Sequence, residues 1–395
     1  MKGGYFMPKE IRVGMVGYKF MGKAHSHAYR DVGMFFKMKA LPVMKAICGR
    51  TENAVAEAAK TYGWESYETS WEKLVERDDI DLIDIATPVN LHKDIAVAAA
   101  KEGKHILCEK PMAMNLDEAK EMLEAAEKAG IKHMVGFNYR KVPALVLAKR
   151  LIDEEALGKI YHFRAMYLQD WIVDPNFPLV WRLRKEVAGS GALGDLGAHI
   201  VDLARFLIGE FDSVTCTTKT FIKERPEPVS VTGLTAKAGK KMGKVTVDDA
   251  ATAIAKFKNG ALGTFEVTRF ATGRKNCERI EVNGSKGSLF FDLERINELQ
   301  FFSSEDKDYT RGFKTILVTE ASHPYIKAWW PPGHVIGWEH AMIHQVYDLM
   351  ESIANDKMPT PSFVDGVKCQ AVLDALSRSA EDGKWVKIVE EAKGK

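Results

Sequence analysis

His105-Ile106-Leu107-Cys108-Glu109-Lys110-Pro111 is an apolar run that ends in two charged residues and a proline. The apolar part predicts a buried strand of a parallel sheet, and such sheets hold their ligands at the carboxyl ends of their strands. Lys110 would therefore lie at a ligand site. Pro111 keeps Lys110 out of helical conformation and permits a cis peptide bond, which would fix the direction of the amine. The alternative is an ordinary turn with a solvated lysine.

Residues 1–137 repeat this strand-and-helix unit. The other predicted strands are Ile11–Val16, Val43–Cys48, Leu82–Ala86 and Met134–Phe137. Helical patterns separate most of them, and the turns are short. This alternation predicts an α/β fold with a doubly wound parallel sheet and right-handed crossovers.

The first of these strands leads into a glycine turn, Gly17-Tyr18-Lys19-Phe20-Met21-Gly22, and then into a helix. A strand, a glycine turn and a helix N-terminus form a dinucleotide pyrophosphate site, because the turn exposes backbone N–H groups and the helix adds partial positive charge. Lys19 stands where the motif usually has its middle glycine. It could either hinder backbone approach or bind a phosphate.

The second strand ends in Cys48-Gly49-Arg50-Thr51. NAD-binding units usually have a carboxylate here for the ribose 2′-hydroxyl, whereas a 2′-phosphate needs a cation. Gly49 supplies no carboxylate, while Arg50 supplies a guanidinium. The sequence therefore favours NADP over NAD, and the alternative is an exposed arginine in a helix-opening turn.

The pattern changes after Asn138, and we predict a second domain over residues 138–395. Strand-like runs follow one another from Ser213 to Phe302, with hairpin turns expected at Asn259-Gly260 and Asn283-Gly284. This succession predicts an α+β domain with a large, open and mainly antiparallel sheet. Helices are expected at 190–207, 338–355 and 366–382.

The expected helix at 190–207 contains the second chemical motif. Asp195, His199 and Asp202 would share one helical face, since they are four and three residues apart. A carboxylate one turn from an imidazole can orient it, and histidine titrates near neutral pH, as a general base for an alcohol must. The alternative is a solvated Asp–His pair without a catalytic role.

Composition and charge limit the classes of protein. The 395 residues, 46% of them hydrophobic, are enough for two domains with sizeable cores. The formal charge is +2 with basic and acidic residues interleaved, which argues against a nucleic-acid partner. The five cysteines are dispersed and odd in number, as expected of reduced thiols in the cytoplasm. Met1–Glu10 lacks the apolar core of a signal peptide, and no apolar run is long enough to span a membrane.

Four motifs occur together: the glycine turn, Thr87-Pro88-x-x-Leu91-His92, Glu109-Lys110-Pro111 and Gly194-Asp195-x-Gly197-x-His199-x-x-Asp202. In this order they resemble the glucose-fructose oxidoreductase, inositol dehydrogenase and rhizopine-catabolism (Gfo/Idh/MocA) family of sugar dehydrogenases, over nearly the whole chain. Tyr167–Trp171, Trp181-Arg182 and Gly189–Asp195 are most similar to its levoglucosan dehydrogenase branch. The resemblance implies a Rossmann domain, an open-sheet substrate domain, and a homodimer or homotetramer.

The resemblance also implies roles for individual residues. Lys110 would hold the reacting hydroxyl of a cyclic sugar, anhydrosugar or polyol near the nicotinamide, His199 would be the acid/base, and Asp195 would bind a hydroxyl or orient His199. The expected cofactor-binding residues are Gly17, Lys19, Phe20, Met21, Gly49, Arg50, Thr51, Thr87, Pro88, Asn90, His92, Glu109 and Lys110. The expected substrate-binding residues are Lys110, Tyr139, Gln169, Asp195, His199, Trp181 and His340.

Two alternatives stay open. A tightly bound cofactor could support transient oxidation with elimination or glycoside cleavage, or the protein could be a non-catalytic dinucleotide sensor. His340 and His344 have a spacing that could bind a metal, but no third ligand is evident and the reaction needs none, so we predict no metal site.

Overall fold

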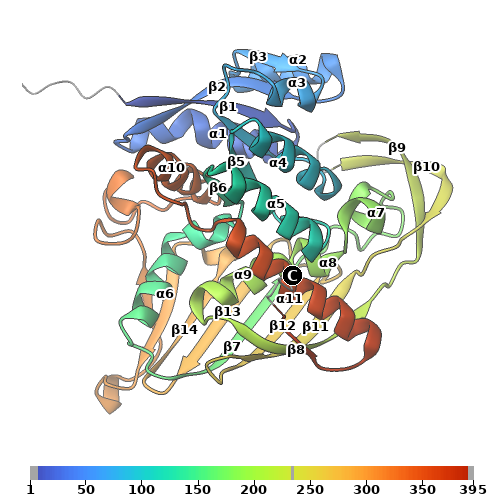
Figure 1. Ribbon diagram of the computed structural model, residues 1–395. Coiled ribbons are helices and arrows are strands. Elements are labelled where there is room, and N and C mark those ends of the chain that lie inside the picture. Colours follow the sequence, from blue (N-terminus) through green and yellow to red (C-terminus); the bar gives the residue numbers. More distant parts are fainter. Residues whose placement is uncertain (1–7, 233–234, 390–395) are drawn as a thin grey trace, which may run out of the picture. The chain divides into compact units, whose positions relative to one another are not determined.

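The computed structural model describes residues 8–232 and 235–389 (Figure 1). It divides into two compact units. The first unit contains the described residues up to Met112, Asp117–Asn138 and Glu339–Gly366, and the second contains Ala113–Leu116, Tyr139–Trp338 and the described residues from Val367. Residues 1–7, which make up most of Met1–Glu10, lie outside the described residues.

The first unit is built on a six-stranded parallel sheet with the order β3-β2-β1-β4-β5-β6. The strands are β1 Lys9–Val16, β2 Ala40–Cys48, β3 Ser66–Glu68, β4 Leu82–Ile85, β5 His105–Cys108 and β6 His133–Val135. Each neighbouring pair is parallel, which confirms the predicted doubly wound sheet. Strand β3 was not predicted, since three partly exposed residues leave no recognisable pattern.

The helices of this unit connect successive strands. They are α1 Phe20–Phe35, α2 Glu52–Tyr62, α3 Trp71–Val75, η1 Val89–Leu91, α4 His92–Lys101 and α5 Leu116–Ala129, with η2 Asn138–Lys141 at the exit. The carboxyl ends of β1, β2, β4 and β5 precede α1, α2, η1 and the Lys110 segment. Four predicted cofactor-binding segments therefore belong to the same edge of one sheet.

A segment from the C-terminal half of the sequence returns to the first unit. Helix α10, His340–Ala354, packs against α1 (Figure 1). Two hydrogen bonds hold the segment after α10 against β6. Val135 N donates to Pro361 O at 3.1 Å, and Phe363 N donates to Nδ1 of the His133 side chain at 3.0 Å. The predicted single boundary at residue 137 leaves out this returning segment. The pattern of an amphipathic helix shows that one face is buried, but it does not show which part of the protein that face packs against.

The second unit contains a nine-stranded sheet with the order β16-β15-β14-β13-β7-β12-β11-β8-β17. Only the β7–β12 pair is parallel, which confirms a mainly antiparallel sheet. The strands are β7 Ile160–Leu168, β8 Phe211–Lys219, β11 Ala250–Phe257, β12 Leu262–Thr268, β13 Cys277–Gly284, β14 Gly287–Asp292, β15 Glu298–Ser303, β16 Lys314–Leu317 and β17 Val386–Lys387.

Helices cover one face of this sheet (Figure 1). They include α6 Pro143–Asp153, α8 Ala192–Asp195, α9 Gly197–Leu207 and α11 Phe363–Asp382, while α7 Lys185–Ala188 and the short turns η3 Trp181–Leu183, η4 Leu293–Arg295, η5 Asp308–Thr310 and η6 Ile326–Ala328 lie in connections. In β11, Ala251, Ala253 and Ala255 are buried while the residues between them are exposed. This alternation is expected of a sheet with one covered face and one open face.

Two details of the second unit differ from the sequence prediction. A separate hairpin of β9 Glu224–Thr232 and β10 Thr235–Lys244 was not predicted, because Pro226 and Pro228 argue against a strand. Prolines are tolerated in edge strands, and both strands of a two-stranded sheet are edges. Asn259-Gly260 does join paired strands β11 and β12, but Asn283-Gly284 ends β13 and the turn follows it.

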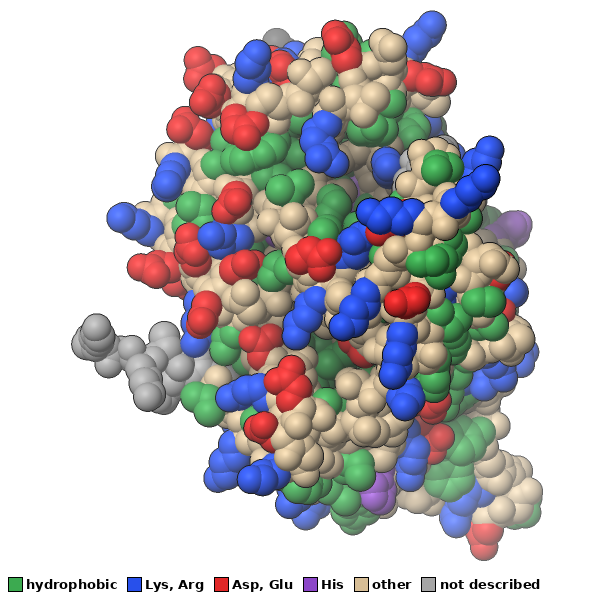
Figure 2. Space-filling view, turned by 90° about the vertical axis from the view of Figure 1, so that its right-hand side faces the viewer, with side chains coloured by type: hydrophobic (Ala, Val, Ile, Leu, Met, Phe, Trp, Pro, Cys, Tyr) green, Lys and Arg blue, Asp and Glu red, His purple; other side chains and the backbone are tan. Residues whose placement is uncertain are grey.

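Figure 2 shows a face on which Lys and Arg side chains are interspersed with Asp and Glu, as the interleaved sequence predicts. Among the helices that the structure describes, none is both long and apolar enough to cross a membrane.

Candidate active site

The glycine turn after β1 has the shape of a phosphate site. Gly17 has a φ of +114°, and a Cβ there would lie 2.4 Å from the Ala86 carbonyl oxygen. A Cβ on Gly22 would lie 2.2 Å from the Gly17 carbonyl oxygen, so the turn and helix are too close for side chains. Helix α1 begins with no acidic residue in its first turn, and Lys19 gives it no side-chain cap. The positive end of the helix dipole is therefore available for an anion.

The end of β2 has a glycine, Gly49, where a ribose-binding carboxylate would be expected. A Cβ at Gly49 would lie 2.1 Å from Cε1 of Tyr18, so the tyrosine ring occupies the space that an acidic side chain would need. Arg50 and Thr51 are exposed at the start of α2. The sequence-based expectation of a 2′-phosphate site rests on Gly49 and Arg50.

The loop after β4 is fastened to the Lys110 segment by His92. Its Nε2 lies 3.0 Å from the Thr87 carbonyl oxygen and its Nδ1 lies 3.1 Å from the Pro111 carbonyl oxygen, with 1% of the residue exposed. The imidazole was predicted to contact the cofactor, but both ring nitrogens face protein carbonyls. In contrast, Oγ1 of Thr87 is buried without a hydrogen-bond partner among the described residues. That hydroxyl is an available polar group beside the sheet edge.

Lys110 follows β5, is partly buried, and precedes a cis peptide bond to Pro111. Its neighbour Glu109 was also predicted to bind cofactor. Glu109 is only 4% exposed, however, and its carboxylate contacts His25 inside the unit. The tight glycine turn, the uncapped helix and the orphan Thr87 hydroxyl together fit a dinucleotide. The other predicted residues of this unit, Phe20, Met21, Pro88 and Asn90, belong to the same turns.

In the second unit, His199 lies on α9 beside two tyrosines. Its ring centroid is 4.6 Å from that of Tyr139 and 5.8 Å from that of Tyr167, and 6% of the residue is exposed. The hydroxyls of the two tyrosines are 2.9 Å apart. Burial raises the pKa of Tyr139 to about 12, so its phenol stays protonated at neutral pH and can donate a hydrogen bond.

Three further side chains extend this group. Oδ1 of Asn276 accepts from the Tyr167 hydroxyl and from Nε2 of Gln169, both at 2.8 Å. Nε1 of Trp338 donates to the Tyr139 hydroxyl at 3.2 Å. We call these residues the histidine cluster: Tyr139, Tyr167, Gln169, His199, Asn276 and Trp338. Tyr167, Asn276 and Trp338 were not among the predicted site residues, although Tyr167 and Gln169 are two apart at the end of one strand and therefore share a face.

Asp195 and His199 do not share one continuous helix. Asp195 ends α8 and His199 lies in α9, with Leu196 between the two helices. Asp195 forms an ion pair with the buried guanidinium of Arg269, whose Nη2 lies 2.9 Å from Oδ2. Arg269 comes from the segment after β12, and its partner could not be identified from sequence because the two residues are distant in the chain.

Asp202 has a different environment from the one predicted. Both of its carboxylate oxygens accept hydrogen bonds from Arg140, at 2.7 Å from Nε and 2.6 Å from Nη2. Asp202 is 1% exposed and Arg140 is 6% exposed. A buried bidentate pair of this kind is costly to break, because the remaining charge would be left unpaired. Asp202 therefore anchors α9 rather than offering a free carboxylate beside His199.

Trp181 and Arg182 lie in η3, close to Asp195. The Arg182 guanidinium stacks on the Trp181 ring, 4.4 Å from its centroid. Burial lowers the pKa of Arg182, although the negative charge of Asp195 opposes this effect. Within the described part of the chain the guanidinium donates no hydrogen bond. A largely buried guanidinium with unused donors is expected to receive them from a ligand or water.

His340, the last predicted substrate contact, is the first residue of α10 and belongs to the first unit. Its Nδ1 lies 3.5 Å from Oε1 of Glu339, the residue that precedes the helix.

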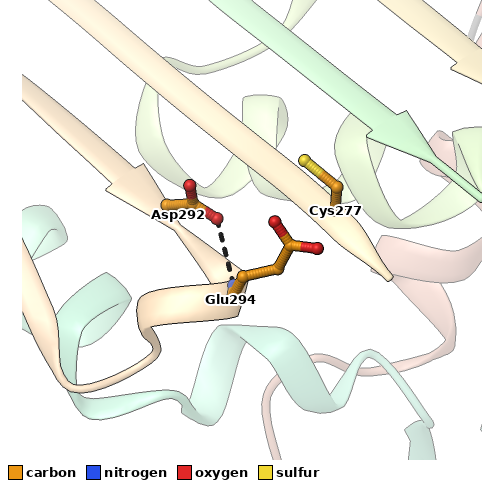
Figure 3. A group of neighbouring side chains, drawn as sticks. All are labelled: Cys277, Asp292 and Glu294. Carbon is orange, nitrogen blue, oxygen red and sulfur yellow. Dashed lines mark hydrogen bonds between the residues drawn. The ribbon is translucent and has the colours of Figure 1, made fainter. Parts of the chain in front are cut away.

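A group of possible metal ligands occurs elsewhere in the second unit. Among the described residues, Cys277, Asp292 and Glu294 have ligand atoms within 4.8 Å of one another (Figure 3). Asp292 also accepts from Nε of Arg279 at 2.8 Å, and Glu294 pairs with Arg274 at 3.5 Å. Burial raises the pKa of the Cys277 thiol. Two guanidiniums and a protonated thiol make this an ion-pair network, and we do not assign it as a metal centre.

The chain is similar along its whole length to proteins of known class. It is 44% identical over 385 residues to levoglucosan dehydrogenase of Pseudarthrobacter phenanthrenivorans, covering 96% of this chain and 98% of that protein. A crystal structure of an oxidoreductase domain protein from Kribbella flavida is 50% identical with a TM-score of 0.92, covering 97% and 100% of the two chains. A structure of levoglucosan dehydrogenase with NADH and levoglucosan is 43% identical with a TM-score of 0.92, covering 97% and 100%.

Two family models match successive parts of the chain. The oxidoreductase family with an NAD-binding Rossmann fold matches residues 11–137, and the GFO/IDH/MocA C-terminal domain matches residues 145–290. These matches agree with the parallel sheet, its glycine turn, and the open sheet of the second unit. The chain therefore belongs to the Gfo/Idh/MocA family of oxidoreductases.

Proposed function

We propose that this protein is a nicotinamide-dependent dehydrogenase that oxidises a ring secondary hydroxyl of a cyclic sugar, with an anhydrosugar of the levoglucosan type as the favoured substrate. The observation that carries the proposal is the histidine cluster, in which a buried imidazole lies among hydroxyl, amide and indole groups. The histidine cluster can hydrogen-bond several hydroxyls of a sugar at once, while its aromatic rings pack on the apolar face of the sugar ring.

In this proposal a bound nicotinamide dinucleotide supplies the hydride acceptor, and the protein supplies position and proton transfer. Lys110 holds the reacting hydroxyl by charge and hydrogen bonding. His199 takes the proton from the hydroxyl oxygen as the hydride leaves the carbon for the nicotinamide, because the carbonyl oxygen that forms cannot retain that proton. Asp195 binds a neighbouring hydroxyl, since its ion pair with Arg269 holds the carboxylate in place. Tyr139 and Gln169 contact the remaining hydroxyls.

The test is the absorbance of reduced nicotinamide with purified protein, NADP or NAD, and a panel of anhydrosugars, inositols, aldoses and glycosides. We expect turnover with anhydrosugars and none with acyclic alcohols. Dinucleotide binding without any reduction across the panel would contradict the proposal, and it would favour either a cofactor that is not released or a sensor.

Arg182 should determine substrate affinity, because its guanidinium has unused donors beside Asp195. We expect Arg182→Met to raise KM for the sugar by about tenfold, equivalent to about 1.4 kcal/mol of lost binding, while the dissociation constant for the dinucleotide stays the same. Steady-state kinetics and dinucleotide titration measure the two quantities. Arg164→Met, which removes an exposed arginine of β7, is the matched control, and equal KM changes in both variants would remove Arg182 from the site.

Arg50 should determine the choice of cofactor in favour of NADP. We expect Arg50→Ala to weaken NADPH binding by about tenfold or more and NADH binding little, because only the former carries a 2′-phosphate. Fluorescence titrations of both cofactors measure the effect. The control is Arg30→Ala, since Arg30 is exposed on α1 and pairs with Asp31. Equal losses for both cofactors would contradict a phosphate-binding role.

A further inference from the structure

A buried ionic network lies directly behind Lys110 in the first unit. Nδ1 of His25 is 2.8 Å from Oδ2 of Asp84, and Nε2 of His25 is 3.1 Å from Oε1 of Glu109. The Tyr29 hydroxyl donates to Asp84 at 2.9 Å. His25 and Tyr29 come from α1, Asp84 from β4 and Glu109 from the end of β5. His25 is 1% exposed, Asp84 0% and Glu109 4%.

The contacts indicate that His25 carries a positive charge. Both of its ring nitrogens face carboxylates, and only the doubly protonated ring can donate to both. Burial by itself lowers the pKa of His25, but the two carboxylates outweigh burial and raise it to about 10. The other titratable groups around the network are Tyr29, Cys108, His92 and Lys110. Burial raises the pKa of Tyr29 and of Cys108 and lowers that of His92, so these three stay neutral at neutral pH.

The network is connected to the Lys110 backbone. The second carboxylate oxygen of Glu109 accepts from the Lys110 backbone N–H at 3.3 Å. Gly136, after β6, leaves the space for this carboxylate, since a Cβ there would lie 2.4 Å from Oε1 of Glu109. Glu109 is therefore held by His25 on one side and by the Lys110 peptide on the other.

We propose that His25 is a positioning residue for Lys110, acting through Glu109 as a fixed cation that holds this carboxylate against the Lys110 peptide. This inference rests on the proposed role of Lys110. It adds a buried residue on α1, outside the motifs that carry the sequence resemblance. Without the cation, two buried carboxylates would share one site, and one of them would take up a proton or turn away.

The first test is His25→Gln, which keeps a donor but removes the charge. We expect kcat to fall by about tenfold or more, with NADH affinity unchanged and a new ionisation in the pH profile of kcat. His27→Gln is the matched control, because His27 is two residues away on the same helix and pairs with Asp31 at 2.9 Å near the surface. Parallel losses of kcat, NADH affinity and melting temperature would indicate a merely structural role and overturn the proposal.

A rescue variant separates charge from packing. In the double variant His25→Gln/Glu109→Gln only Asp84 stays charged. The amide introduced at position 25 can donate to Asp84, and its oxygen can accept from the amide introduced at position 109. We expect this double variant to regain kcat relative to His25→Gln and to lose the added ionisation. A double variant slower than His25→Gln would contradict an action through Glu109.

A second route changes no charged group. Gly136→Ala would push the Glu109 carboxylate away from His25, and we expect the same loss of kcat with unchanged NADH affinity. This variant decides the question if His25→Gln does not fold, and an unaltered kcat would overturn the proposal. Crystal structures of the variants give a readout that needs no activity, since the Lys110 amine should shift. An active Lys110→Ala would instead refute the proposed function, which distinguishes the two failures.

Discussion

Lys110→Ala should abolish sugar oxidation while leaving dinucleotide binding intact. Removing one preorganised donor at a reacting oxygen typically costs about 10²–10³-fold in kcat, and Lys110 supplies both charge and a hydrogen bond. The site that we expect to hold the dinucleotide is built from the glycine turn, the start of α1 and the loop after β4, none of which depends on the lysine ammonium. Stopped-flow hydride transfer and NADH fluorescence titration measure the two properties.

The control for this prediction is Lys101→Ala, which removes an exposed lysine at the end of α4. Lys110→Arg is informative as well, because it keeps the charge but changes the geometry and reach of the donors. We expect it to remain strongly impaired. Turnover of Lys110→Ala close to that of the native protein would refute the role assigned to Lys110.

His199→Asn should have the second large effect, with kcat reduced by about 10²–10⁴-fold. The amide keeps hydrogen-bonding capacity next to Tyr139 but cannot accept a proton at neutral pH. We therefore expect the pH dependence of hydride transfer to flatten over the range in which histidine titrates. The residual rate should rise with hydroxide concentration if solvent takes over as the base.

His162→Asn is the control, since His162 is an exposed histidine of β7 in the same unit. Single-turnover kinetics across the pH range separate the chemical step from product release. If His199→Asn retained the native pH profile at a reduced rate, the imidazole would have a binding role and another group would be the base.

Local sequence was sufficient to predict the parallel sheet. The strand at His105–Cys108 has the predicted bounds, because a mostly buried apolar strand flanked by charged residues is recognisable without its neighbours. The glycines at 17 and 22 likewise specify their own backbone, since no side chain fits at either position. The order of the motifs along the chain was enough to identify the family as a resemblance. Full-length similarity to known members then established that the chain belongs to it.

Pairings between distant residues could not be predicted from the sequence. Asp195 and Asp202 look equivalent along an expected helix, yet one pairs with Arg269 and the other with Arg140. No sequence motif surrounds Asn276, so its role could not be predicted. It joins the histidine cluster because β13, which follows it, pairs with β7. The packing of α10 against α1 could not be predicted either. An amphipathic pattern shows that one face of a helix is buried, but it does not identify the element that covers this face.

Patterns along the chain therefore sufficed to identify which residue types stand at the carboxyl ends of the strands, and hence the dinucleotide fold and the position of Lys110 after β5. How those groups are held depends on three-dimensional packing. His25 is separated by 59 positions from Asp84 and by 84 from Glu109, yet the three residues form one buried network. Periodicity encodes burial locally, whereas the partner of a buried charge is chosen by whichever strands and helices pack around it.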